Sequence, residues 1–161
     1  MHESLAVISN TSPLFYLHCI DRTQILHQLY GRVHITGQVA DELGAGGVDA
    51  AKVGWLEWID IRQVCTPATL NLVPDLGAGE ASSIALALEL GSSTLLLLDD
   101  RLARRIAGLH RLRMTGTAGV LMKAKENGLI PAIRPLLGDL IKAGFHLRTK
   151  HMDELCRLVG E

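Results

Sequence analysis

Residues 94–107 read TLLLLDDRLARRIA, and this stretch decides the fold. Thr94 to Leu98 is a short, almost wholly apolar run, which is typical of a strand buried on both faces of a parallel sheet. Asp99 and Asp100 follow directly, and apolar residues recur at helical spacing over 101–107. The order is therefore a strand, two carboxylates and a helix, which is the unit from which α/β proteins are built.

The same alternation extends through the rest of the chain. The further expected strands are Leu5 to Ser9, Arg32 to Ile35, Ile59 to Val64 and Leu112 to Thr115. The further expected helices are Ser12 to Ile20 with Ser12 as N-cap, Asp21 to Tyr30, Thr36 to Leu43, Val48 to Trp58, Gly79 to Leu90, Thr117 to Asn127, Pro131 to Ala143 and Thr149 to Val159, and Cys65 to Leu76 is expected to be irregular. Alternating strands and helices predict an α/β fold, a three-layer α/β/α sandwich with a central parallel sheet of about five strands.

Composition limits the class of protein. The chain has 161 residues of which 48% are hydrophobic, enough for one domain, expected over residues 1–161. A formal net charge of -1 argues against a globally basic nucleic-acid-binding protein, so any such binding must be local. Three widely spaced cysteines, no secretion signal near the N-terminus and no uninterrupted membrane-length apolar stretch predict a cytoplasmic protein with reduced thiols.

Acidic and amide side chains recur where predicted strands end and predicted helices begin. Asn10 ends the first strand, Glu42 lies in the second turn of the helix after the second strand, and Glu80 lies in the first turn of the buried helix. Asp99 and Asp100 end the central strand. Because strand C-termini and helix N-termini share one edge of a parallel sheet, we expect these residues to meet there.

Clustered carboxylates repel one another unless a cation lies among them. Oxygen ligands without His or Cys neighbours favour Mg²⁺ or Mn²⁺ over Zn²⁺, and such ions assist the hydrolysis of phosphodiesters. Metal ligation is expected from Glu42, Glu80, Asp99 and Asp100, catalysis from these four with Asn10, and substrate binding from Arg101, Arg104, Arg105 and Ser12, since guanidinium groups pair well with phosphate. Plainer interpretations stay open: Asn10 as a turn former, Glu42 as solvated helix surface, Glu80 as a partner of its helix dipole, Asp99-Asp100 as an N-cap, and the arginines as a solvated helix face.

Five segments resemble those of PIN domains of the bacterial and archaeal branch that opens with SNTSPL. These segments are VISNTSPL at 7–14, QVADEL at 38–43, LGAGEASSIALAL at 76–88, LLLLDDRLARRIA at 95–107 and TGTAGVL at 115–121. The resemblance implies a metal-dependent ribonuclease whose acidic quartet would be Asn10, Glu42, Glu80 and Asp99, with Asp100 a rival of Asp99. The departure is Asn10, where most PIN nucleases have Asp.

Three hypotheses follow. The leading one is a metal-dependent endoribonuclease acting on RNA or single-stranded nucleic acid. Since many PIN domains are toxins of toxin–antitoxin pairs and similar domains commonly dimerise, the resemblance makes an antitoxin and a homodimer candidate partners. The alternative, motivated by the charge missing at Asn10, is an inactive module that binds RNA or a protein. A phosphate-handling Rossmann-like enzyme ranks third, since no glycine-rich nucleotide loop follows the first strand.

Overall fold

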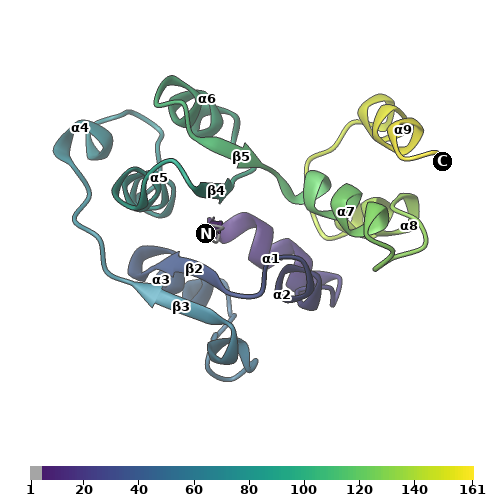
Figure 1. Ribbon diagram of the computed structural model, residues 1–161, viewed down its shortest axis with the longest axis horizontal. Coiled ribbons are helices and arrows are strands. Elements are labelled where there is room, and N and C mark those ends of the chain that lie inside the picture. Colours follow the sequence, from purple (N-terminus) through teal and green to yellow (C-terminus); the bar gives the residue numbers. More distant parts are fainter. Residues whose placement is uncertain (1–4) are drawn as a thin grey trace.

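The protein, seen here as a computed structural model that describes residues 5–161, is built around a five-stranded parallel sheet (Figure 1). The strand order is β3-β2-β1-β4-β5. The strands are β1 (Ala6–Ser9), β2 (Val33–Thr36), β3 (Ile59–Arg62), β4 (Thr94–Leu97) and β5 (Arg113–Thr115). All four strand pairings are parallel, which confirms the predicted sheet.

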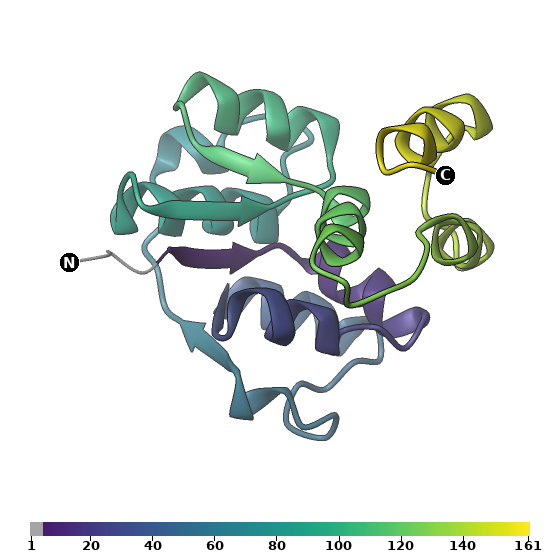
Figure 2. The same ribbon diagram turned by 45° about the vertical axis from the view of Figure 1, so that its right-hand side comes forward.

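Helices connect the strands and cover both faces of the sheet, as the three-layer prediction requires. They are α1 (Thr11–Cys19), α2 (Gln24–Tyr30), α3 (Gly37–Ala45), the 3-10 turn η1 (Trp55–Glu57), α4 (Ala68–Asn71), α5 (Ala78–Leu90), α6 (Arg101–Leu109), α7 (Thr117–Glu126), α8 (Arg134–Lys142) and α9 (Thr149–Leu158). The arrowheads of β1, β4 and β5 point toward the side of the molecule that carries α7, α8 and α9 (Figure 2). The C-terminal ends of these strands therefore face the last third of the chain.

Two hydrophobic clusters form the core, one on each face of the sheet. Val7 and Ile8 are neighbours in β1, yet Val7 packs into the cluster with α1, α2 and α7, and Ile8 packs into the cluster with α4, α5 and α6. Successive residues of a strand point to opposite faces, which explains this division. The apolar run in β4 divides in the same way, with Leu97 on the first face and Leu96 on the second.

Two predicted helices need correction. The first helix begins at Thr11, not at Pro13, so its N-cap is Asn10 and the side chain of Ser12 is free to bond elsewhere. Residues 48–58 do not form the predicted α-helix, because the Asp49 carboxylate accepts the backbone N–H of Ala51 and so favours a turn. Gly54 then adopts a left-handed conformation with φ 77°, and only the 3-10 turn η1 follows it.

The remaining boundaries agree with the prediction within a few residues, apart from the loop Cys65 to Leu76. That loop contains the short helix α4, whose Leu70 is buried against the second cluster. Trp55 and Trp58 are both core residues. No helix within residues 5–161 has the length and apolar character needed to cross a membrane.

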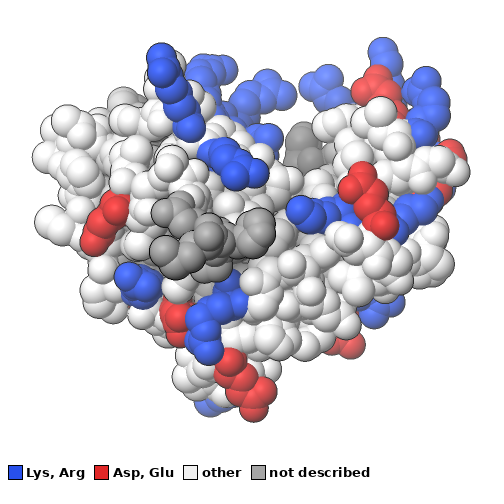
Figure 3. All heavy atoms as spheres, viewed as in Figure 1, with Lys and Arg blue, Asp and Glu red and all other residues white. Residues whose placement is uncertain are grey.

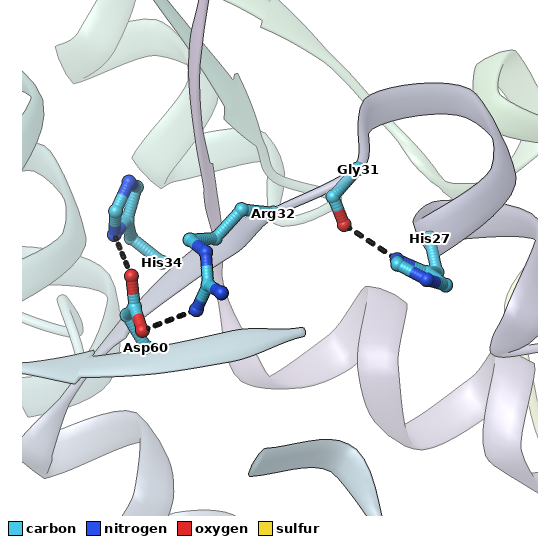
Figure 4. Close-up of polar contacts among 5 residues, drawn as sticks. All are labelled: His27, Gly31, Arg32, His34 and Asp60. Carbon is cyan, nitrogen blue, oxygen red and sulfur yellow. Dashed lines mark hydrogen bonds and ion pairs between the residues drawn. The ribbon is translucent and has the colours of Figure 1, made fainter. Parts of the chain in front are cut away.

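A cluster of polar contacts extends from α2 and the loop after it to β2 and β3 (Figure 4). Arg32 forms an ion pair with Asp60 at 2.7 Å, and Nδ1 of His27 donates to the carbonyl oxygen of Gly31. Burial lowers the pKa of His34, and Arg62 lowers it further although Asp60 opposes both effects. His34 is therefore neutral at pH 7, and its 3.7 Å approach to Asp60 is not an ion pair.

Candidate functional site

The C-terminal ends of the strands open onto a cleft of about 780 Å³. Seven residues predicted from the sequence line this cleft: Asn10, Ser12, Glu80, Asp99, Asp100, Arg101 and Arg104. They come from β1, α1, α5, β4 and α6, so the crossover topology brings distant stretches of chain to one place. The structure therefore brings these seven predicted side chains together at one edge of the sheet.

Asp99 is the most tightly held acid of the cleft. Its Oδ1 accepts the backbone N–H of Thr117 at 2.7 Å, and its Oδ2 accepts the hydroxyls of Thr117 at 2.6 Å and Ser12 at 2.9 Å. Gly116 makes this approach possible, because a Cβ there would lie 2.8 Å from Oδ1 of Asp99. The side chain of Ser12 therefore positions a carboxylate instead of capping its own helix.

Asp100 and Glu80 each use one oxygen to satisfy the start of a helix. Asp100 is the N-cap of α6, and its Oδ2 accepts the N–H of Ala103 at 2.9 Å. Glu80 Oε2 accepts the N–H of Gly77 at 2.8 Å. Within the described residues, the other oxygen of each carboxylate has no hydrogen-bond donor from the protein.

The pKa of Glu80 shows that these acids influence one another. Burial is the largest cause that raises the pKa of Glu80, the hydrogen bond from Gly77 lowers it, and the negative charges of Asp100 and Glu42 raise it further. The net direction is upward. Carboxylates that repel one another in this way form a region where a cation is electrostatically favoured.

Asn10 is buried at 4% exposure, and its Oδ1 has no hydrogen-bond partner among the described residues. A buried amide oxygen without a partner costs free energy, so it calls for an explanation. Asn10 also lines the cleft beside Glu80 and Asp99. Its unsatisfied oxygen therefore belongs to a residue that lines the cleft, and the oxygen itself is covered.

Glu42 lies beside this cleft and is not one of its lining residues. Its Oε1 accepts the N–H of Gly79 at 2.8 Å and its Oε2 accepts the hydroxyl of Thr11 at 2.5 Å. Gly79 has to be small here, because a Cβ would collide with the Glu42 carboxylate. The predicted role of Glu42 as a metal ligand stays a prediction.

The three arginines of α6 differ in position. Arg101 and Arg104 line the cleft, and Nη1 of Arg104 donates to the carbonyl oxygen of Leu98 at 2.8 Å. Arg105 is exposed and does not line the cleft. The bond to Leu98 places Arg104 on the same side of Gly116 as Asp99. A Cβ at Gly116 would lie 2.8 Å from Oδ1 of Asp99 and 3.4 Å from Nη1 of Arg104.

Thr117 and one whole side of the cleft were not predicted from the sequence. Thr117 directly follows β5 at the same sheet edge, and the same rule that selected Asn10 and Asp99 would have found it. The opposite side of the cleft includes Tyr16, Phe145, His146 and His151. Of these, the last three lie in and after the connection from α8 to α9, where no strand end marks them.

A family model described as a PIN domain matches residues 6–161. The chain belongs to the PIN-domain family. No curated protein matches it. PIN domains are nucleases in general and typically use divalent metal ions, so membership indicates a nuclease-type function on nucleic acid.

The residues of this PIN domain can be tested for their fit to a divalent cation. Within residues 5–161, no three His, Cys, Asp or Glu side chains are grouped so that they could hold a metal ion by themselves. The oxygens at the cleft therefore fit a cation only if the amide oxygen of Asn10 counts as a donor. Its burial, its missing partner and its place beside two acids meet that condition.

Proposed function

We propose that this PIN domain is a metal-dependent endoribonuclease that acts as a single domain. The observation that carries the proposal is the unpartnered, buried Oδ1 of Asn10 in a cleft that also contains Glu80, Asp99 and Asp100. What supports the proposal is that this oxygen belongs to a residue in the same cleft as acids that repel one another, because a cation would satisfy both.

Asn10, Glu80 and one of the rivals Asp99 and Asp100 are the proposed holders of Mg²⁺ or Mn²⁺, with Glu42 beside them. When bound, such a cation activates water and offsets the charge on the leaving oxygen of a phosphodiester. The protein contributes orientation, because Ser12 and Thr117 fix the carboxylate of Asp99 before substrate arrives.

Arg104 and Arg101 are the proposed phosphate contacts. The bond to Leu98 fixes Arg104 in the cleft, so less side-chain entropy is lost when it binds a phosphate oxygen. Arg105 has the same charge on the same helix and lies outside the cleft lining. It therefore serves as a matched control for the other two.

An inactive module that binds RNA or a protein is the second candidate. It is favoured by the missing charge at Asn10 and by the fact that each acid already accepts a hydrogen bond from the protein. Such a module would bind RNA with equal affinity in the presence of Mn²⁺ and of a chelator.

Purified protein incubated with single-stranded RNA and Mn²⁺ or Mg²⁺ tests the proposal. Cleavage is expected, with complete loss on chelation and a loss of at least about a hundredfold in the joint variant Glu80→Gln and Asp99→Asn. Arg104→Ala is expected to slow cleavage and Arg105→Ala to leave it unchanged. Cleavage that survives the joint carboxylate variant would show that the nuclease site is elsewhere or belongs to a contaminant.

The cytoplasmic location, the homodimer, the toxin role and the antitoxin partner stay predictions that rest on the resemblance. Expression of the chain in a bacterial host tests the toxin role, since growth arrest is expected for the natural chain and not for the joint carboxylate variant. Sedimentation of the purified protein tests the dimer.

A further inference from the structure

We infer that the side of the cleft opposite the acids binds a nucleobase of the substrate, so that the enzyme contacts the base as well as the phosphate. This wall consists of Tyr16, Phe145, His146, Leu147, His151 and Leu155. The inference rests on the proposed function and deepens it, because it adds a second class of contact to the same site.

The chemistry of this wall suits a flat apolar ligand. Phe145 and Tyr16 pack edge to face with ring centroids 5.2 Å apart, and Leu147 and Leu155 lie beside them in the first core cluster. All four are only partly buried, so part of their apolar surface faces the cleft. Stacking of a base on such side chains is favourable whatever the base, since every base has a π-face.

The same wall offers polar groups at its rim. His146 and His151 are exposed and line the cleft. A neutral imidazole carries one donor and one acceptor, and these are the groups that the edge of a base requires. Tyr16 is held in place by its hydroxyl, which donates to the carbonyl oxygen of Gly144 at 3.4 Å.

The opposite side of the cleft explains why the occupant is a nucleotide and not a simple apolar molecule. Arg101, Arg104 and the acids supply the charged side of the cleft. The aromatic wall lines the same cleft, whose volume is about 780 Å³. A volume of this size encloses a ligand that has both an anionic and a flat apolar part. A nucleotide has both parts joined through one ribose.

The surface charge agrees with a strand that continues beyond the cleft. In Figure 3, Lys and Arg side chains gather over α6 on one side of a hollow, and Lys and Arg side chains lie together with acidic ones over the region of α9 on the other. Phosphates that flank a bound nucleotide would meet positive charge on both sides. The net charge of the whole chain is -1, so this charge is local.

Binding of adenosine 5′-monophosphate and of ribose 5-phosphate, measured by calorimetry with Mg²⁺, tests the inference without requiring cleavage. The two ligands carry the same phosphate, and only the first has a base. The nucleotide is expected to bind about fivefold or more tightly, as base stacking predicts. Equal affinities, or no binding of either ligand at millimolar concentration, would overturn the inference.

Variants of matched chemistry locate the base. Phe145→Leu keeps an apolar side chain and is expected to remove the affinity gap, and His146→Ala with His151→Ala is expected to reduce it. Phe15→Leu is the control, because Phe15 also packs against Tyr16 and does not line the cleft. A gap that survives both Phe145→Leu and the histidine variants places the base elsewhere and overturns the inference.

Cleavage separates this inference from the proposed function. If the protein cleaves RNA and shows no affinity gap, the nuclease proposal stands and the base wall fails. If it shows the gap without cleaving RNA, the nuclease proposal fails and the wall stands as a nucleotide-binding surface. If it does both, single-stranded RNA with an abasic site at the scissile nucleotide is expected to be cleaved about fivefold or more slowly.

Discussion

Each acid of the candidate site is bonded to the start of a helix. Asp99, Asp100 and Glu42 accept backbone N–H groups of α7, α6 and α5, and Glu80 accepts that of Gly77. Helix N-termini favour negative charge, so these bonds hold the carboxylates in place at the cleft. None of the four has an ion pair with Lys or Arg within the described chain. Their charge therefore remains available to a cation.

Asn10→Asp tests how much the amide limits the site. A carboxylate there restores one negative charge among the ligands, and affinity for divalent cations rises with ligand charge. We expect Mn²⁺ to bind roughly tenfold more tightly and RNA cleavage to be faster. Calorimetry and an RNA cleavage assay measure the two effects.

The same variant has an opposite effect when no metal is present. A buried carboxylate without a partner costs stability, so Asn10→Asp should unfold at a lower temperature than the natural chain in chelator and recover in Mn²⁺. Asn127→Asp, on the exposed C-terminal end of α7, is the control. Unchanged Mn²⁺ affinity in Asn10→Asp would remove Asn10 from the proposed ligands.

Gly116→Ala tests whether Asp99 has to lie where it does. The added Cβ would be 2.8 Å from Oδ1 of Asp99, so the carboxylate must shift away from Thr117. Misplacement on this scale commonly costs about a hundredfold in rate. We expect a comparable loss of RNA cleavage with the fold retained, as measured by circular dichroism.

Gly108→Ala is the matched control for that experiment. Gly108 lies in α6, and a Cβ there meets only Cε of Met114 at the ordinary distance of 3.8 Å. Full activity in Gly116→Ala would mean that the bonds between Thr117 and Asp99 serve only the fold.

At the scale of the element, local chemistry decided which predictions held. The helix α5 and the strand β4 were predictable because their apolar residues are continuous and each is followed by a clear break. The stretch 48–58 has a helical pattern of apolar residues, and its Trp55 and Trp58 are indeed buried. Burial at that spacing did not require a helix, because Asp49 and Gly54 impose turns that periodicity does not register.

Gly138→Ala is expected to stabilise α8. Gly138 lies inside the helix, has no positive φ, and a Cβ there would meet nothing within 4 Å. Alanine restricts the unfolded chain and favours the helix, so the free energy of unfolding should rise by about 0.5–1 kcal/mol. Urea unfolding measures it.

Gly31→Ala, at the end of α2, is the control for which the opposite change in stability is expected. Gly31 ends α2 at φ 71°, a conformation that alanine adopts only with strain, so this substitution should lower the free energy of unfolding. Destabilisation by Gly138→Ala as well would mean that α8 packs more closely at Gly138 than the open space indicates.

At the scale of the whole molecule, Glu161 links the segment after α9 to both α7 and α8. It accepts the N–H groups of Ile133 and Arg134 at the start of α8, and it forms an ion pair with Lys125 of α7 at 3.0 Å. Desolvation, the largest single influence, raises the pKa of Glu161, but the hydrogen bonds from Ile133, Lys125 and Arg134 together hold that pKa below its usual value.

This depressed pKa predicts how stability depends on pH. The stabilisation from Glu161 is fully present above the pKa of an unfolded glutamate, about 4.3, and is lost as pH falls through the lower folded pKa. Glu161→Gln should therefore be less stable than the natural chain at pH 7, with the difference vanishing in acid. Urea midpoints between pH 3 and pH 7 measure it, with the exposed Glu154→Gln as control. A difference independent of pH would contradict the assignment.

The cleft as a whole was only half predictable from the sequence. The acidic side follows from topology, because strand ends in a parallel sheet share an edge. The aromatic side depends on where α8 and the segment after it pack, and that is a long-range matter of core packing between Leu137, Leu140 and the first cluster. No local pattern near Phe145 indicates that it lines the same cleft as Asp99.

Apart from Tyr16, the aromatic wall lies far along the chain from the acidic side of the cleft, which has a consequence during synthesis. A ribosome translating this message releases Asn10 through Arg104 early and residues 144–155 some 40 codons later, and proteins emerge at about 5–20 residues per second. Until that late segment folds back, a nascent chain has only Tyr16 of the proposed base-binding wall.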